Sequence, residues 1–89
     1  MHSAAITSKV LQFLDPQSTD RVLDVGCGDG KFTSNYLSHI AEVYGVDASP
    51  SFVESATKDY GSSQARFKVV DCRYLEKDED AVKGGWDKA

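Results

Sequence analysis

The stretch DVGCGDG, residues 24–30, decides how this chain folds. Residues 21–27, which overlap it, are a short run with two valines between a loop and glycines, and they indicate a buried strand. The glycines that follow let the backbone turn sharply and let a ligand approach it without a Cβ in the way. Residues 31–40 then carry apolar side chains at helical spacing. The sequence therefore predicts a strand, a glycine turn and a helix whose N-terminus points at a ligand.

The spacing of these glycines excludes two common nucleotide-binding patterns. The nicotinamide-cofactor fingerprint, GxGxxG, needs a third glycine where Lys31 stands. The phosphate-binding loop, GxxxxGK followed by Ser or Thr, needs a glycine at Val25 and a hydroxyl residue at Phe32. What remains is an acid followed by GxGxG, so a nicotinamide-binding domain ranks far behind as an alternative.

Helix and strand signals alternate along the chain. Ser49 and Pro50 are typical of a helix start, as N-cap and first helical residue, and Gly61 is a typical stop. The predicted helices cover residues 3–14, 31–40, 50–60 and 76–82, and the predicted strands cover residues 21–27, 42–47 and 66–71. Short connections between alternating elements imply parallel strands with right-handed crossovers. We therefore predict an α/β fold, a Rossmann-like doubly wound parallel sheet truncated to about three strands in the order 3-2-1, with flanking helices.

Three aspartates stand at the carboxyl ends of the predicted strands or next to them. Asp24 precedes the glycine turn, Asp47 ends the second strand, and Asp71 ends the third. An acid about 20 residues past such a turn accepts hydrogen bonds from ribose hydroxyls, which fits Asp47. All three should share one sheet edge, where ligands of open α/β folds bind.

Three motifs in order now resemble the class I S-adenosylmethionine-dependent methyltransferases. VLDVGCGDGKFT at residues 22–33 is similar to the first motif of that family, and VYGVDASPSFVESA at residues 43–56 to its ribose-binding motif. VVDCRYL at residues 69–75 is similar to the adenine-binding motif. The resemblance implies S-adenosyl-L-methionine as cofactor and methyl transfer as the activity.

The resemblance also implies cofactor contacts, residue by residue. The backbone of Gly26, Cys27 and Gly28 would line the methionine part, and Asp24 would approach the amino group through water. Asp47 would hold the ribose, and Ala48 would pack beside the adenine. Asp71 would accept a hydrogen bond from the adenine amino group, with the backbone N–H of Cys72 donating nearby. No residue is expected to be catalytic and no metal is expected, because the cofactor supplies the chemistry and the protein supplies alignment.

Simpler interpretations of the same residues remain open at this point. Asp24 could cap the turn, Asp47 could be a solvated loop acid, and Asp71 could be a plain strand-end acid. Cys27 has no histidine base placed beside it, so we interpret it as a small residue packed in a turn rather than a nucleophile. The acids at residues 76–80 are interpreted as a solvated run, not a metal site.

The resemblance ends before the fourth strand of the family. We expect one partial methyltransferase domain over residues 1–89: an N-terminal helix (1–15), the cofactor-binding unit (21–75) and an acidic tail (76–89) before the missing strand. A fragment or truncated gene product is favoured over a self-sufficient minimal domain, because small domains are marginally stable. The first strand would then present an open edge and invite self-association. The alternative function is a non-catalytic, truncated module that binds the cofactor or another chain.

Composition bounds the partners that we expect. The 89 residues carry a formal net charge of −4 and no stripe of Lys or Arg, which argues against nucleic acid and favours a small-molecule methyl acceptor. No apolar run reaches the roughly 20 residues of a membrane span, so no membrane partner is expected. Two distant cysteines and no secretory signal suggest reduced thiols and a cytoplasmic location.

Overall fold

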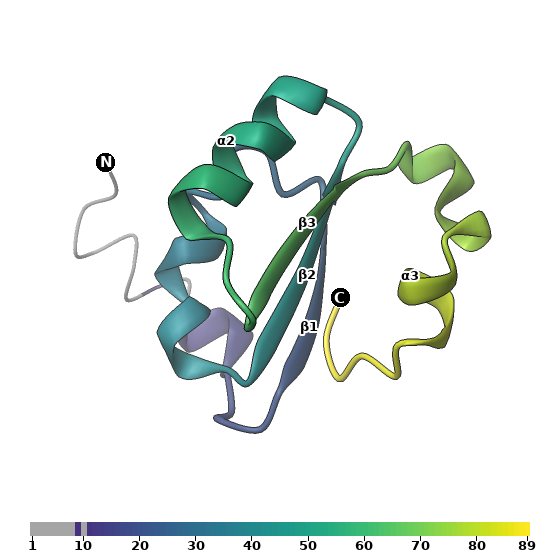
Figure 1. The fold of residues 1–89 in the computed structure, drawn as a ribbon. Coiled ribbons are helices and arrows are strands. Elements are labelled where there is room, and N and C mark those ends of the chain that lie inside the picture. Colours follow the sequence, from purple (N-terminus) through teal and green to yellow (C-terminus); the bar gives the residue numbers. More distant parts are fainter. Residues whose placement is uncertain (1–8, 10) are drawn as a thin grey trace.

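The computed structural model describes residues 9 and 11–89, and a parallel sheet runs through its centre (Figure 1). The three strands of the sheet are β1 (Arg21–Val25), β2 (Glu42–Asp47) and β3 (Ala65–Val69), in the order β1-β2-β3. This is the predicted 3-2-1 order read from the opposite edge. Residues 9 and 11–14 are helical, and the rest of the helix predicted over residues 3–14 lies outside the described residues.

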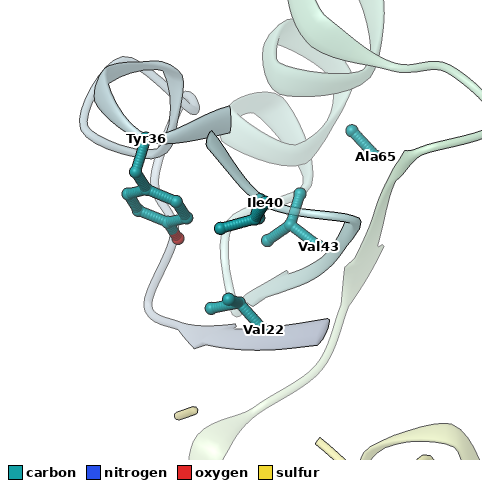
Figure 2. Packing of buried hydrophobic residues seen from close by; sticks show 5 residues of the cluster. All are labelled: Val22, Tyr36, Ile40, Val43 and Ala65. Atoms are coloured by element: carbon teal, nitrogen blue, oxygen red, sulfur yellow. The ribbon is translucent and has the colours of Figure 1, made fainter. Parts of the chain in front are cut away.

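One face of the sheet is covered by α2 (Pro50–Tyr60) and by the segment that precedes β2. Helix α2 begins as predicted, with the Ser49 Oγ accepting a hydrogen bond from the Phe52 N–H at 3.3 Å. Buried apolar side chains from the strands and the preceding segment form the core on this side: Val22, Tyr36, Ile40, Val43 and Ala65 (Figure 2). This packing holds the parallel strands β1 and β2, whose carboxyl ends lie at the same edge of the sheet.

The segment at residues 31–40 departs from the predicted α-helix. It forms two short 3-10 turns, η1 (Thr33–Asn35) and η2 (Leu37–His39). The Ser34 Oγ donates to the Lys31 carbonyl at 2.6 Å, and the Asn35 side-chain amide donates to the Phe32 carbonyl at 2.9 Å. Such side-chain bonds to nearby backbone compete with an α-helical ladder. The apolar stripe is still used in part, because Tyr36 and Ile40 are buried, whereas Phe32 is 51% exposed.

The other face of the sheet is covered by η3 (Cys72–Lys77), α3 (Glu79–Lys83) and the residues up to 89, the yellow-green part of Figure 1. Leu23, Tyr44, Val46 and Ala81 form its buried core, with Trp86 packed against it. The expected short helix at residues 76–82 therefore exists in a different form, as the end of η3 and the whole of α3. Over the described residues, no helix combines the length and apolar composition needed to cross a membrane.

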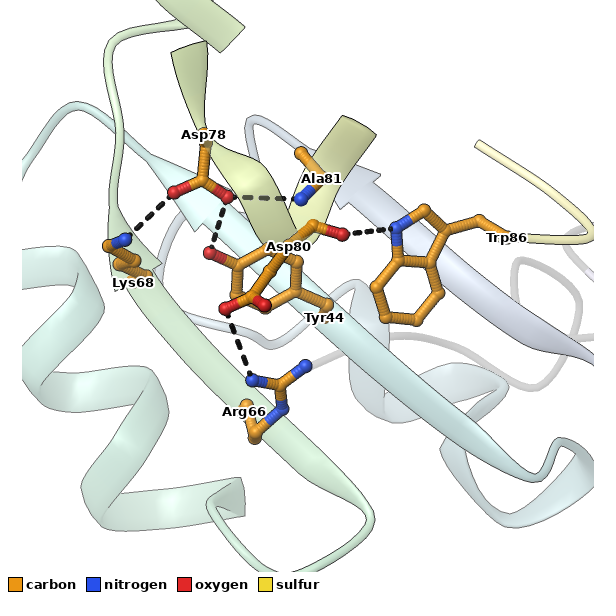
Figure 3. A network of polar contacts seen from close by, with 7 residues as sticks. All are labelled: Tyr44, Arg66, Lys68, Asp78, Asp80, Ala81 and Trp86. Atoms are coloured by element: carbon orange, nitrogen blue, oxygen red, sulfur yellow. Dashed lines mark hydrogen bonds and ion pairs between the residues drawn. The ribbon is translucent and has the colours of Figure 1, made fainter. Parts of the chain in front are cut away.

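The interpretation of residues 76–80 as a wholly solvated run is wrong at Asp78, whose side chain is only 6% exposed. Its Oδ2 accepts from the Tyr44 hydroxyl at 2.8 Å and from the Ala81 N–H at 3.1 Å (Figure 3). Its Oδ1 accepts from the Lys68 Nζ at 2.8 Å. Asp78 is the N-cap of α3. The same carboxylate therefore caps the start of the helix and accepts the hydrogen bond of the buried Tyr44 hydroxyl.

The expectation of an open edge on β1 needs a correction too. The chain returns to this edge, where Lys88 forms a parallel bridge with Val22. The Leu23 N–H donates to the Lys88 carbonyl at 2.9 Å, and the Asp87 N–H donates to the Arg21 carbonyl at 2.7 Å. The first half of the edge is therefore paired within the chain, while Val25 at its carboxyl end is 41% exposed.

Candidate cofactor site at the carboxyl edge of the sheet

The glycine turn after β1 has the shape of an open elbow. Gly26 and Gly28 adopt φ of +75° and +57°, a region that side chains with a Cβ disfavour. A Cβ built on either residue would meet nothing within 4 Å, whereas one on Gly30 would lie 2.7 Å from the Tyr60 ring. Gly30 is therefore small because α2 packs against it, while Gly26 and Gly28 border free space.

Asp47 joins the elbow to the end of β2. The Gly28 N–H donates to the Asp47 Oδ2 at 2.9 Å, and the Ser49 N–H donates to the Oδ1 at 2.9 Å. The N–H groups of Gly26 and Cys27 both donate to the Val46 carbonyl, at 2.8 and 3.0 Å, so the elbow continues the β1–β2 ladder. The structure thus brings the glycine turn and the acid one crossover later into direct contact at one sheet edge. Each Asp47 oxygen keeps acceptor capacity beyond its backbone bond.

Asp24 lies at the same end of β1 and bonds to side chains rather than to the turn backbone. Its Oδ2 accepts hydrogen bonds from the Thr33 hydroxyl and from the Tyr36 hydroxyl, the latter at 2.7 Å. Sequence reasoning missed both donors, because it treated Thr33 only as part of a motif and Tyr36 only as core. Their three-residue spacing was the available signal, since residues i and i+3 face the same side of a 3-10 turn.

Cys27 is buried inside the elbow, 6% exposed, and its thiol is free. Burial, together with the charges of Asp24 and Asp47, raises its pKa to about 12. A thiol with such a pKa stays protonated at neutral pH and is a poor nucleophile. This geometry favours the packing role over covalent chemistry.

The end of β3 lies beside Asp47, because the Val70 N–H donates to the Asp47 carbonyl at 3.0 Å. The next residue, Asp71, directs its carboxylate to Arg73, whose Nη2 lies 2.6 Å from the Oδ2. The side-chain and backbone hydrogen bonds from Arg73 lower the pKa of Asp71 to about 2. Ala48 and Cys72 are both exposed at this edge.

A hollow of about 480 Å³ on the outer side of β3 contains none of the predicted site residues. Two of the charged side chains that line it, Arg66 and Lys68, pair with Asp80 at 3.6 Å and with Asp78 at 2.8 Å. The arrangement there serves the packing of the C-terminal segment on the sheet, so the carboxyl edge remains the candidate site.

Comparison with known proteins identifies the family of the chain. Residues 22–84 match the family model of the methyltransferase domain. A 23S rRNA (uracil(1939)-C(5))-methyltransferase of Salmonella choleraesuis is 31% identical over 83 residues, which is 93% of this chain and 19% of that protein. An uncharacterised methyltransferase of Schizosaccharomyces pombe is 37% identical over 51 residues, covering 57% of this chain and 20% of that protein.

A solved structure with the same fold leads in the same direction. The TehB-like S-adenosylmethionine-dependent methyltransferase of Corynebacterium glutamicum is 27% identical, with a TM-score of 0.56 over 73% of this chain and 34% of that one. The chain spans 12% to 20% of the length of the curated relatives that we compared.

One expectation about partners is overturned by these relatives. Net charge led us to exclude nucleic acid and to favour a small-molecule acceptor, yet several relatives are named as 23S rRNA methyltransferases. The charge argument fails because it describes 89 residues, whereas the surface that meets RNA in such a relative belongs to a protein about five times longer. An acidic cofactor-binding segment is therefore compatible with an RNA substrate.

The match to the family model covers residues 22–84, and this range includes the three motifs, the sheet and the elbow that meets Asp47. The chain belongs to the methyltransferase domain family, and it is a Rossmann-like domain of the S-adenosylmethionine-dependent class.

Proposed function

We propose that residues 21–75 bind S-adenosyl-L-methionine at the carboxyl edge of the sheet and that this chain supplies the cofactor-binding part of a methyltransferase. The observation that carries the proposal is the 2.9 Å hydrogen bond from the Gly28 N–H to the Asp47 carboxylate. It places an open, Cβ-free backbone surface next to an ionisable acceptor, which suits a ligand that joins a sugar to an amino acid.

The residues present fit this cofactor. Free space above Gly26 and Gly28 would admit the methionine part. Asp47 is held in place by two backbone N–H groups and would accept from ribose hydroxyls with its remaining lone pairs. Ala48 offers a small exposed side chain next to Asp47 for the adenine ring.

The role of Asp71 in this proposal depends on Arg73. The guanidinium occupies both carboxylate oxygens, with three side-chain contacts between 2.6 and 3.1 Å. Because Arg73 is exposed, it can move aside, and the ionised Asp71 would then accept from the adenine amino group beside the backbone of Cys72.

The protein's part in the reaction is to hold and align. When bound, S-adenosylmethionine supplies a methyl group already activated by its sulfonium. The elbow and Asp47 would fix the two ends of the cofactor, which turns a bimolecular encounter into an oriented one. Cys27 stays neutral and contributes shape.

Isothermal titration with S-adenosylhomocysteine tests the proposal on this chain. We expect Asp47→Ala to weaken binding by about 2–3 kcal/mol, because a charge-assisted hydrogen bond of this kind is worth that much. This corresponds to a loss of roughly 30- to 150-fold in affinity. Asp47→Asn retains an acceptor oxygen and should lose less.

Asp59→Ala is the matched control, since Asp59 is an exposed acid at the C-terminal end of α2, whereas Asp47 precedes the start of that helix. It changes the net charge equally and should leave the affinity unchanged. Equal affinity for parent and Asp47→Ala, or no binding by the parent, would refute the proposal. The alternative of a non-catalytic module is not favoured, because the family model matches as a methyltransferase domain.

A further inference from the structure

Two hydroxyl groups converge on one oxygen of Asp24. Thr33 donates from η1, and Tyr36 donates from the turn that follows, both to Oδ2. Thr33 is fully buried and Tyr36 is 3% exposed, so both donors are fixed by packing. Two fixed donors on the same oxygen leave the carboxylate a single orientation.

The other oxygen of Asp24 is left available. Within residues 9 and 11–89, no group donates a hydrogen bond to Oδ1, and no buried side-chain oxygen or nitrogen of these residues lacks a partner. Oδ1 is therefore open to the outside rather than sealed in the core. An accessible carboxylate oxygen held in one orientation is suited to receive a cationic group.

The surroundings of Asp24 select what that cation can be. Asp24 lines a hollow of about 370 Å³ at the carboxyl end of β1, and most of the other residues that line it are apolar, among them Leu23, Val25 and Phe32. Lys88 lines it as well, but its ammonium is paired with Asp20. Because the Lys88 ammonium is already paired, the free Asp24 oxygen in a mostly apolar hollow favours a compact ammonium carried on an apolar stem.

Tyr36 is suited to act as a permanent donor. Burial, and then the charge of Asp24 and the hydrogen bond to it, raise the pKa of the Tyr36 hydroxyl well above its usual value. The hydroxyl therefore keeps its proton throughout the physiological range, and the orientation of Asp24 does not change with pH there.

We propose that Thr33 and Tyr36 are positioning residues, which hold Asp24 so that its Oδ1 receives the ammonium group of the amino-acid end of the cofactor. The inference rests on the proposed function, because it assumes that the cofactor lies on the elbow.

The test compares two ligands that differ only at the amino-acid end. S-adenosylhomocysteine carries the ammonium, and methylthioadenosine keeps the adenine, ribose and sulfur without it. Thr33→Val retains the shape of the side chain and removes its hydroxyl. We expect Thr33→Val and Tyr36→Phe each to weaken S-adenosylhomocysteine about tenfold and to change methylthioadenosine less than about twofold. Thr33→Ser should restore the parent's preference.

Tyr44→Phe is the matched control, because it removes another buried hydroxyl–carboxylate bond, to Asp78, on the opposite face of the sheet. It should lower stability and leave the ratio of the two affinities unchanged. If Thr33→Val does not fold, as judged by circular dichroism, the two ligand affinities of Tyr36→Phe decide the test, because the phenyl ring of this variant still fills the core.

The outcomes separate the two proposals. A parent that binds neither ligand refutes the proposed function. A parent that binds both, with variants that lose both ligands equally or lose neither, refutes the positioning role alone.

Discussion

At Gly28, a substitution can separate the cost of an unfavourable backbone conformation, measured as stability, from the loss of space for the ligand, measured as affinity. A Cβ there meets no protein atom, but φ of +57° is costly for any residue that has one. We expect Gly28→Ala to lower the free energy of unfolding by about 1–2 kcal/mol, measured by urea denaturation. The added methyl would also occupy the space that we assign to the cofactor, so titration should show a loss of S-adenosylhomocysteine binding beyond the stability change.

Gly85→Ala provides the comparison at the same scale. Gly85 adopts φ of +67°, and its added Cβ would lie 3.7 Å from Arg21 Nη1, an ordinary contact far from the elbow. This variant should lose a similar amount of stability while keeping its affinity. Similar losses of affinity in both variants would show that backbone strain, not occupied space, is responsible.

The elements that could be predicted from sequence are those whose signals are local. β1 and β2 are short runs with two valines each, bounded by turn residues, and α2 has its own N-cap and stop. β2 and α2 formed where expected, and β1 ends two residues earlier than expected, at Val25. The turns at residues 31–40 were not predicted, because the hydrogen bonds from Thr33 and Tyr36 to Asp24 on β1 cannot be read from the local sequence pattern. The helical spacing of their apolar residues was real, but two long-range hydrogen bonds and local side-chain bonds outweigh it.

The candidate site divides in the same way. The meeting of Gly28 and Asp47 follows from spacing alone, because parallel strands end at one edge of the sheet. The partners of Asp24 and the burial of Asp78 do not, since each depends on side chains brought together by the completed sheet. Charge patterning predicts solvation for an acidic run unless a buried donor such as Tyr44 is known to face it.

Helix α3 is attached to the sheet through Asp78, and this attachment should depend on pH. Burial opposes ionisation of Asp78, but hydrogen bonds from Lys68, Tyr44 and the Ala81 N–H outweigh it and lower its pKa below the ordinary 3.8. A lowered folded-state pKa contributes stability above the unfolded value, and that contribution is lost as the pH falls through the folded value. Asp78→Asn should therefore cost about 2 kcal/mol at pH 7 and less at pH 3, where part of the contribution of the carboxylate is lost.

Urea denaturation of parent and variant at the two pH values measures this difference. Glu79→Gln is the control, because Glu79 is an exposed acid in the first turn of the same helix. It should change stability little at either pH. A penalty for Asp78→Asn that is the same at pH 7 and pH 3 would mean that the carboxylate charge does not stabilise the attachment.

Over the whole molecule, the C-terminal segment acts as the second layer of a small domain. Trp86 stacks on Tyr44 with ring centroids 5.8 Å apart, Arg21 lies over the Trp86 ring at 4.7 Å, and the indole N–H donates to the Asp80 carbonyl at 3.0 Å. The same segment carries Asp87 and Lys88 onto the edge of β1. One aromatic side chain therefore helps to cover a sheet face and to hold the pairing of an edge.

Trp86→Ala should consequently have two effects. The first is a loss of about 2–3 kcal/mol in the free energy of unfolding, since a half-buried tryptophan contributes somewhat less than a fully buried one. That is a large fraction of the stability of an 89-residue chain. The second is exposure of the β1 edge and of Tyr44, which should appear in sedimentation velocity as concentration-dependent association, because unpaired strand edges pair with other chains.

Tyr74→Ala, which removes an aromatic ring that is 51% exposed on η3, should produce neither effect. A destabilised Trp86→Ala that remains monomeric at all concentrations would show that the pairing of Lys88 with β1 survives without the tryptophan, and that edge and face are covered independently.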